Sequence, residues 1–372
     1  MEFKTQQEDL LAALSRVQSI VEKRSTMPIL QNILLKVDKN TLKIFATDLE
    51  VSLVDEIQVG GKTDGGLAVS AKNLFDIIKE LDSGAMLISK KENNSLIISQ
   101  KRSEFNLLGV ASEEYPVFPT YATNDFIAIE RKLFLDMIDK TVYSVSNDLT
   151  RYHLNGVFFE AKNKQKIPAF RMVATDGHRM SLVDREATGI GSFKVDHGVI
   201  IPRKGVNEIR KLLEAIDGNF EIAIEGAQFI LKNKNTVLMV RLVEGKYPNY
   251  QQLIPEKLPK KISIKRESLI TSLKRVSLLA NQKSRGVVLS ISKGKMEIAS
   301  NDPELGNAKE ELDVDYDGVG MKISFNAKYI LDVLNACDKE SVDISLNDQL
   351  SPGLVRPHND NSYTCVVMPM RI

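Results

Sequence analysis

The sequence predicts an α+β protein built from three similar domains in tandem, each with two helices packed on antiparallel sheets. Three observations support this prediction: short motifs recur along the chain, two helical patterns occur in each copy, and strand patterns joined by short turns lie between them. The sheets are expected to be antiparallel because a parallel sheet would need a crossover helix between most of its strands. The 372 residues are enough for three domains that each bury a core.

The recurring motifs keep one order at a spacing of about 125 to 130 residues, which fits duplicated domains and is too long for a solenoid repeat. The first marker is Ala46-Thr47-Asp48, Ala174-Thr175-Asp176 and Ser300-Asn301-Asp302, and the second is Val69-Ser70-Ala71-Lys72, Ile201-Pro202-Arg203-Lys204 and Phe325-Asn326-Ala327-Lys328. Glu114-Tyr115-Pro116 and Lys246-Tyr247-Pro248 end the first two copies alike. We therefore expect domains at residues 1–122, 123–253 and 254–372.

Each copy begins with an amphipathic helix, indicated by apolar residues that recur at helical spacing. The positions are Leu10, Leu14, Val17 and Val21 in the first copy, Leu133, Met137 and Thr141 in the second, and Leu269, Leu273, Val276 and Ala280 in the third. Alternating patterns then predict strands at 33–37, 42–46 and 51–59, at 156–161 and 170–174, and at 287–292 and 295–299. Residues 38–40 have the composition of a turn.

A second helix follows in each copy, and further strands close the copy. The helix is carried by Leu74, Ile77, Ile78 and Leu81, then by Val206, Ile209, Leu213 and Ile216, and then by Ile330, Val333, Leu334 and Cys337. Closing strands are predicted at 85–89, 95–99 and 105–110 in the first copy. The order in every copy is thus helix, strands, helix, strands.

The composition is that of a soluble globular protein, with 43% hydrophobic and 27% charged residues. No apolar run approaches the length of about 18 residues that a membrane helix needs, and we expect neither export nor a membrane span. The two cysteines, Cys337 and Cys365, belong to no metal-binding motif and are expected to be reduced, buried and inert. A net charge of +1 means that any binding to nucleic acid depends on local charge.

Signatures of catalysis are weak. Gly61-Lys62-Thr63 matches the end of a phosphate-binding loop, but Glu56 stands where that motif needs its first glycine, so we expect a glycine-rich turn there. The four histidines lack the spacing of a zinc site. Asp176-Gly177-His178-Arg179 could combine an acid, a base and a cation, or could simply form a β-turn. We expect no enzyme activity, no cofactor and no metal.

Basic residues gather at helices in more than one copy. Residues 265–285 carry six lysines and arginines against Glu267 alone, and a weaker basic stretch contains Arg203, Lys204, Arg210 and Lys211. Such a run on one helix is usually a solvated face, but its recurrence favours a shared role. Basic helices that contact phosphates bind DNA without reading its sequence. The low aromatic content of 6% favours duplex over single-stranded DNA.

The last residues form an unusual tail. Residues 363–367 have the pattern of a strand, and Met368-Pro369-Met370-Arg371-Ile372 follow it, with proline ending the strand. Terminal tails are often frayed. However, two exposed methionines and an isoleucine are unfavourable in water, and methionine suits a surface that accepts varied apolar partners. Both interpretations of the tail remain open from its residues alone.

Together these residues resemble the β subunit of bacterial DNA polymerase III, the sliding clamp family, over the whole chain. The most specific matches are the stretch from Leu30-Gln31-Asn32 to Ala46-Thr47-Asp48-Leu49-Glu50, Tyr152-His153-Leu154-Asn155-Gly156, Val173-Ala174-Thr175-Asp176-Gly177-His178-Arg179, Ile201-Pro202-Arg203-Lys204-Gly205 and Val366-Val367-Met368-Pro369-Met370-Arg371. The resemblance implies a head-to-tail homodimeric ring of the DNA-clamp fold, whose helices line a hole that holds duplex DNA without sequence preference.

The resemblance also implies roles for individual residues. Duplex DNA would be contacted by Arg24, Lys72, Arg203, Lys204, Lys274 and Lys283. The dimer interface would pair Phe105 and Leu107 of one subunit with Leu278 and Leu279 of the other. A pocket for partner peptides would be formed by Leu154, Thr175, Gly177, His178, Arg179, Met180, Pro248, Leu253, Val366, Val367, Met368, Pro369, Met370 and Arg371.

The implied partners are the replicative DNA polymerase α subunit, the clamp-loader complex, repair polymerases and mismatch-repair proteins, which would bind through short linear motifs in the bacterial cytoplasm, at the nucleoid. His153, Gln251 and Gln252 depart from residues common in the family, which affects peptide preference, and Gly306, Asn307 and Lys309 weaken the charge pairing expected at the dimer interface. A non-catalytic peptide-binding scaffold with incidental DNA contact is the alternative function.

Overall fold

The computed structural model describes residues 1–21, 27–162, 168–187 and 198–371. These residues form two compact units, one combining residues 1–132 with 204–242 and the other combining 133–203, apart from the segments not described, with 243–371. The division passes through the second repeat. Each unit is therefore one terminal repeat together with half of the central one.

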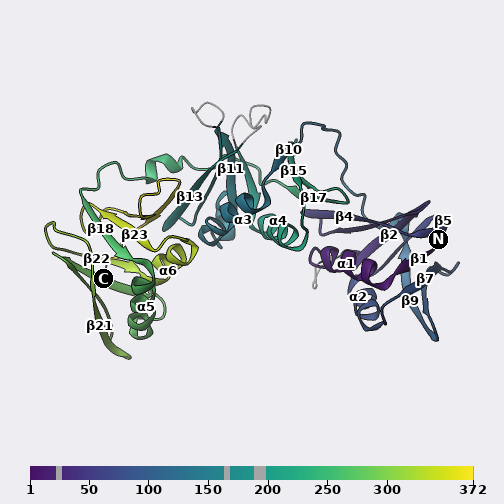
Figure 1. Cartoon of the computed structure of the whole chain (residues 1–372), viewed down its shortest axis with the longest axis horizontal. Helices are drawn as coiled ribbons and strands as arrows, with labels where there is room; N and C mark the ends of the chain where they lie inside the picture. Colours follow the sequence, from purple (N-terminus) through teal and green to yellow (C-terminus); the bar gives the residue numbers. More distant parts are fainter. Residues whose placement is uncertain (22–26, 163–167, 188–197, 372) are drawn as a thin grey trace. The chain divides into compact units, whose positions relative to one another are not determined.

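The described residues of the first repeat form eleven helices and strands, besides two short 3-10 helices, in the order strand, helix, strands, helix, strands. Its elements are β1 (Glu2–Gln6), α1 (Gln7–Val17), η1 (Pro28–Gln31), β2 (Asn32–Asp38), β3 (Thr41–Thr47), β4 (Val51–Gln58), β5 (Gly60–Thr63), β6 (Gly65–Ser70), α2 (Ala71–Glu80), β7 (Ala85–Lys90), β8 (Ser95–Gln100), β9 (Ser103–Ala111) and η2 (Ser112–Glu114). The two helices lie side by side against one face of the sheet (Figure 1).

The second and third repeats follow the same order. The second contains β10 (Ile127–Ile129), α3 (Arg131–Asp139), η3 (Val142–Ser144), η4 (Leu149–Leu154), β11 (Gly156–Lys162), β12 (Ala169–Thr175), β13 (Arg179–Glu186), β14 (Val199–Pro202), α4 (Arg203–Ala215), β15 (Phe220–Glu225), β16 (Gln228–Lys232), β17 (Thr236–Arg241) and η6 (Tyr250–Leu253). The third contains β18 (Lys260–Lys265), α5 (Arg266–Val276), η7 (Ser277–Leu279), β19 (Gly286–Ser292), β20 (Lys295–Asp302), β21 (Gly306–Asp313), β22 (Met321–Asn326), α6 (Ala327–Ala336), β23 (Ser341–Leu346), β24 (Gly353–Pro357) and β25 (Tyr363–Val367). The predicted three-fold internal repeat is confirmed.

The sheets are antiparallel throughout their described pairings and run across the boundaries between repeats. In the first unit, β17 of the second repeat pairs with β4 of the first, which gives a sheet of 13 strands. In the second unit, β25 of the third repeat pairs with β13 of the second, which gives a sheet of 8 strands beside a separate sheet of 4. Neighbouring repeats are therefore joined by main-chain hydrogen bonds as well as by packing.

The helices bury the faces that the sequence pattern indicates. Leu10, Leu14 and Val17 of α1 are buried, and Gln7 on the same face donates a hydrogen bond from Nε2 to the Ile78 carbonyl oxygen of α2 at 2.7 Å. The predicted turn at 38–40 is confirmed by the hairpin between β2 and β3, with Lys39 at a positive φ of 55°. Cys337 and Cys365 are free and buried, as expected, and burial raises the pKa of Cys337 to about 12.

Two expectations about local structure were wrong. The apolar pattern predicted first helices that include Val21, Thr141 and Ala280, but α1 ends at Val17, α3 at Asp139 and α5 at Val276. Thr141 and Ala280 fit the pattern because they are buried from the turns that follow the helices. Residues 60–63 form strand β5 instead of the expected turn. Glycine is required at position 61 because a Cβ atom there would lie 1.6 Å from the Lys39 carbonyl oxygen.

Candidate DNA-facing, partner-binding and dimer surfaces

Three of the lysines predicted to contact DNA are exposed on or next to helices. Lys72 lies in the first turn of α2, where Ser70 caps the helix by accepting a hydrogen bond from the Asn73 amide at 3.3 Å. Lys274 lies in the last turn of α5, and Lys283 lies in the loop after η7. Among the described residues none of the three has an ion-pair partner, so their charges are available to solvent or to phosphates. Arg24 lies outside the described residues.

Arg203 and Lys204, at the start of α4, are instead engaged within the protein. Arg203 donates from Nη2 to the Val145 carbonyl oxygen at 2.5 Å and from Nη1 to the Asn147 side chain. Burial lowers the pKa of Arg203. Lys204 forms an ion pair with Asp48, in the turn between β3 and β4. The structure thus holds these two cations in place and gives each a partner within its own unit.

The proposed partner site begins at the turn between β12 and β13. Asp176 accepts hydrogen bonds at Oδ1 from the amides of His178 at 2.9 Å and Arg179 at 3.0 Å, and Thr175 donates from its hydroxyl to the Arg179 carbonyl oxygen at 2.6 Å. Gly177 has a φ of 87°, which glycine adopts without strain. The β-turn interpretation is confirmed, and it leaves Gly177 and His178 exposed on a fixed loop.

The C-terminal tail is attached to the same turn. Beyond β25 the Met368 amide donates to the His178 carbonyl oxygen at 2.9 Å, and the Met370 amide donates to the Ser324 carbonyl oxygen of β22 at 2.8 Å. The tail is therefore docked through Met370 and is not frayed there. The Met368 side chain stays 40% exposed, although its main chain is fixed.

Arg179 lies beneath this turn and is buried. Its guanidinium forms ion pairs with Asp332 at 2.6 Å and Asp176 at 3.1 Å, and lies 4.6 Å from the ring centre of Tyr329 and 5.2 Å from that of Tyr143. Burial alone would lower the pKa of Arg179, but the bonds to Asp332 and the charge of Asp176 raise it overall. Because α6 carries Asp332, Arg179 ties the second repeat to the third and positions the turn.

The apolar part of the site has a buried floor and an exposed rim. Leu154, Met180, Val366 and Val367 are buried, and Met180 and Val366 pack in one cluster with Phe158, Val173 and Tyr250. Pro248 and Leu253 are exposed, and so are Leu149 and Tyr152 on η4, at 85% and 58%. Leu149 and Tyr152 were not predicted, although two exposed apolar residues shortly before His153 and Leu154 suit a contact surface. Gln251 and Gln252 are exposed on η6.

The residues predicted for the dimer interface lie on one strand and one short turn. Phe105 and Leu107 of β9 are half-buried, while Leu108, which was not predicted, is 76% exposed. On η7, Leu278 is 76% exposed and Leu279 is half-buried. A contact that covered both elements would remove Leu108 and Leu278 from water.

Two strand edges near these leucines are unpaired among the described residues. Strand β21 is the outer strand of its four-stranded sheet. Strand β9 pairs with β8 along 103–108 and with β6 only at 109–111, so its other edge is open over 103–108. An open edge is a template for pairing with another chain.

Within the described residues no group of three or more histidine, cysteine, aspartate or glutamate side chains is arranged to hold a metal ion. No helix among these residues is both long and apolar enough to cross a membrane.

Comparison with known proteins identifies the repeats. Family models described as the N-terminal, central and C-terminal domains of the DNA polymerase III beta subunit match residues 1–119, 128–249 and 251–371. The chain is 32% identical to the beta sliding clamp of Vibrio cholerae and 33% identical to that of Escherichia coli K12, with full coverage of both chains in each case.

Solved structures agree with this assignment. The beta sliding clamp of Caulobacter crescentus superposes with a TM-score of 0.95 at 32% identity, and the DNA polymerase III subunit beta of Pseudomonas aeruginosa with 0.94 at 33%. A sliding clamp from Bartonella birtlesii, solved bound to griselimycin, gives 0.94 at 30%, and all three comparisons cover both chains completely. The chain belongs to the family of DNA polymerase III beta subunits, the bacterial sliding clamps.

Proposed function

We propose that this sliding clamp closes around duplex DNA as a head-to-tail homodimer and holds partner proteins at the surface formed by the turn at Asp176 and the tail at Met368. Its domains would be residues 1–122, 123–253 and 254–372. The clamp has no catalytic role in this proposal, and loading onto DNA depends on the ATPase of a separate clamp loader. We place its action at the nucleoid, in the bacterial cytoplasm.

The main support for a closed ring is a junction between repeats that occurs twice within the chain. Strand β4 pairs with β17, and the Arg241 amide donates to the Glu50 carbonyl oxygen at 2.8 Å. Strand β13 pairs with β25, and the Met368 amide donates to the His178 carbonyl oxygen at 2.9 Å. The strand equivalent to β4 and β13 in the third repeat is β21, and the strand equivalent to β17 and β25 in the first repeat is β9.

These two strands have the open edges described above. A third junction of the same kind, formed between β21 of one subunit and β9 of another, would use both edges and repeat head to tail. Two copies joined in this way close into a ring with two such contacts, and a closed ring leaves no edge for further growth. Leu278 and Leu108, each on or beside one of these elements, would be buried by that contact.

The proposed DNA contacts suit a protein that must slide. Lys72, Lys274 and Lys283 are exposed and unpaired within the described residues, whereas Arg203 and Lys204 already have protein partners. A chain with a net charge of +1 and few free cations would contact phosphates weakly and without sequence preference. Retention on DNA would then depend on encirclement, because tight phosphate contacts would slow sliding.

The proposed partners are the replicative polymerase α subunit, the clamp-loader complex, repair polymerases and mismatch-repair proteins. Each would bind through a short linear segment whose apolar side chains pack on Leu253, Met368 and the buried floor below them. Ordering a flexible segment reduces the net affinity, which suits partners that must exchange.

A panel of fluorescent peptides tests the partner site. Peptides about 24 residues long, long enough to hold a motif with extended flanks on both sides, would tile the α subunit of the same bacterium's replicative polymerase. We expect at least one to bind and Met368→Asp to weaken it about tenfold or more, because a charge replaces an apolar contact. Met27→Asp, at a methionine with a similar exposure of 45%, is the matched control. Equal weakening by both variants, or binding of no peptide, would contradict the proposed site.

A further inference from the structure

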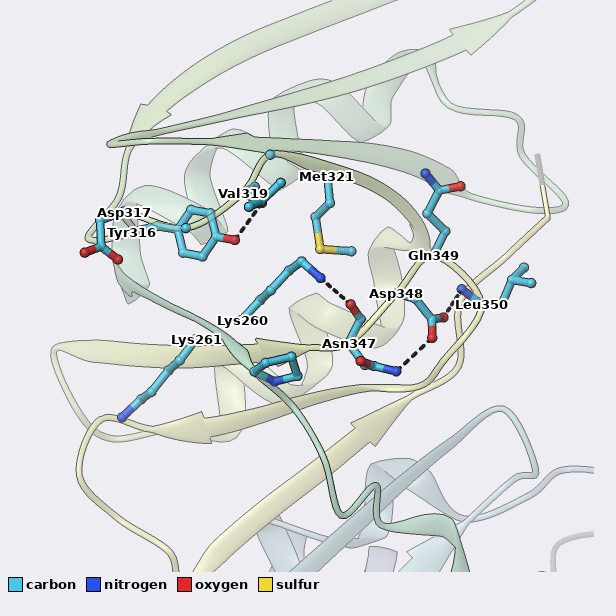
Figure 2. Close-up of a pocket in the computed structure, with 13 residues that line it drawn as sticks. Lys260, Lys261, Tyr316, Asp317, Val319, Met321, Asn347, Asp348, Gln349 and Leu350 are labelled. Atoms are coloured by element: carbon cyan, nitrogen blue, oxygen red, sulfur yellow. Dashed lines mark hydrogen bonds between the residues drawn. The ribbon is translucent and has the colours of Figure 1, made fainter.

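A second recess lies in the third repeat, outside the residues assigned to the partner site. It encloses about 1030 Å³ between the loop that precedes β22 and the loop that joins β23 to β24, with the start of β18 at its base. In Figure 2, Val319 and Met321 lie on one wall, Asn347 and Asp348 lie on the other, and Lys260 extends between them.

Both loops are held in place by hydrogen bonds. Buried Tyr316 donates from its hydroxyl to the Val319 carbonyl oxygen at 2.7 Å. Asp348 accepts at Oδ1 from the amide of Ser351 at 2.7 Å. Figure 2 shows that Asp348 also accepts from the amide of Leu350, at 2.8 Å, and that Lys260 donates from Nζ to the Asn347 carbonyl oxygen, at 2.5 Å. The recess is therefore preformed, and little ordering would be needed for an occupant to enter it.

The recess offers apolar contacts more readily than charged ones. Val319 is 80% exposed and Leu350 is 68% exposed, one on each loop. Three of the four charged residues that line the recess have partners: Lys260 bonds to Asn347, Asp348 bonds to its own loop, and Lys261 forms an ion pair with Asp343 at 3.0 Å. The fourth, Asp317, is exposed to water. An apolar side chain would gain contacts there without leaving these charges unpaired.

The recess and the partner site lie along one rim of the eight-stranded sheet. At that rim β13 begins at Arg179, opposite Val367 where β25 ends, and Val367 is in turn opposite Gly353 where β24 begins. Strand β23 ends at Leu346, opposite Lys260 where β18 begins. Four strand spacings separate β13 from β18, a distance of about 19 Å.

The tail gives a second, independent measure of this proximity. The Met370 amide is bonded to Ser324 of β22, and the same strand begins at Met321 in the wall of the recess. Three residues of strand cover about 10 Å. An extended peptide of about six residues is long enough to reach from the tail to the recess along this rim.

We propose that this recess is a second anchoring subsite for the same partner segment that binds at the tail. The segment would leave the tail site in extended form, cross the rim, and place one apolar side chain between Val319 and Leu350, about six residues from the motif. This inference rests on the proposed function of the tail site. It assigns to the third repeat a role in distinguishing partners by the sequence that flanks their motif.

The test uses the full-length clamp and the tightest-binding peptide of the panel, compared with nested truncations that keep the motif and remove either flank. We expect truncation of one flank to weaken binding about fivefold to tenfold, as loss of one buried apolar side chain would. Val319→Asp and Leu350→Asp should weaken the long peptide by a similar factor and leave the truncated peptide unchanged. Val117→Asp, at a 95% exposed valine of the first repeat, is the matched control.

The outcomes separate the two proposals. Equal affinity of the long and truncated peptides, or no effect of Val319→Asp and Leu350→Asp on the long one, overturns the second subsite while leaving the tail site intact. Loss of truncated-peptide binding in either variant also overturns it, because the change would then act on the tail site or on folding. Absence of binding, or insensitivity to Met368→Asp, overturns the tail site and with it the inference.

Discussion

At the scale of single residues, the recurring aspartates Asp48, Asp176 and Asp302 have one structural role. Each accepts two main-chain hydrogen bonds at Oδ1: from Glu50 and Val51 at 2.9 and 2.7 Å, from His178 and Arg179 at 2.9 and 3.0 Å, and from Glu304 and Leu305 at 2.9 and 3.1 Å. A carboxylate used in this way fixes the turn between two strands. The repeat is visible in the sequence because each copy needs this turn, and Asp176 is accounted for without catalysis.

Arg179→Met should be strongly destabilising. It leaves the carboxylates of Asp176 and Asp332 without their shared cation in a largely buried setting, and we expect a loss of about 3 kcal/mol in the free energy of unfolding. Urea denaturation followed by circular dichroism would measure the loss. Arg151→Met, at an arginine 54% exposed and paired with Asp148 only at 3.5 Å, is the control. A loss no larger than that of Arg151→Met would show that the buried network is unimportant.

Asp343 provides a prediction about pH. Burial alone would raise the pKa of Asp343, but hydrogen bonds from His358, Lys261 and Ser263 outweigh burial and lower it below its usual value of 3.8. A carboxyl with a lowered folded-state pKa adds stability above the unfolded-state pKa, and this stability is lost as pH falls through the folded-state pKa. Compared with Asp343→Asn, the wild type should be more stable at pH 6.

The difference in stability between the wild type and Asp343→Asn should shrink as the pH falls below about 4. Urea midpoints of both, measured from pH 6 to pH 3, would reveal it. A difference that stays constant over this range would mean that ionisation of Asp343 does not contribute.

At the scale of elements, the sequence predicted the order of helices and strands except for the strand that precedes the first helix of each repeat (β1, β10 and β18), and it did not predict how far the sheets extend. Helical patterns located α1, α2, α3, α4, α5 and α6 because each has one buried face. The sequence patterns did not reveal β1 or β5, which are short, or the pairing of β17 with β4 and of β25 with β13, because these pairs join residues far apart in sequence. Helix ends were misplaced where buried residues such as Thr141 and Ala280 continue the pattern into a turn.

The candidate sites were likewise predicted only in part from the sequence. The turn at Asp176 was found because its motif recurs and matches the family, and the tail because methionine and proline after a strand are an unusual ending. Leu149 and Tyr152 were missed because exposure cannot be inferred from residue type. The recess at Val319 was missed because two loops and the start of β18, which are distant in sequence, form it.

Leu278→Asp should disrupt the proposed dimer. The side chain is 76% exposed in one subunit and would be buried beside the β21–β9 contact, where a carboxylate would lose its hydration. We expect the dimer dissociation constant to rise about a hundredfold or more. Analytical ultracentrifugation would measure it, with Leu350→Asp as an equally non-conservative change at an exposed leucine of the same repeat. An unchanged dissociation constant would exclude η7 from the interface.

At the scale of the whole molecule, the near-neutral charge and the repeated junction both favour a closed ring that holds DNA by encircling it. Binding through phosphates alone would give an affinity that falls steeply with salt and does not depend on whether the DNA has ends. A closed ring has the opposite properties, because escape requires either an end or the opening of an interface. The scaffold alternative, in which DNA contact is incidental, lacks this dependence on topology.

Retention on circular DNA tests most directly the claim that the clamp is held on DNA by encircling it. The clamp, loaded by its clamp loader onto nicked circular DNA, would be separated from free protein by gel filtration at high salt, before and after the circle is cut once by a restriction enzyme. We predict that the clamp stays with the intact circle and is lost from the linear product. Equal retention on circular and linear DNA, or loss from the intact circle at high salt, would contradict the ring.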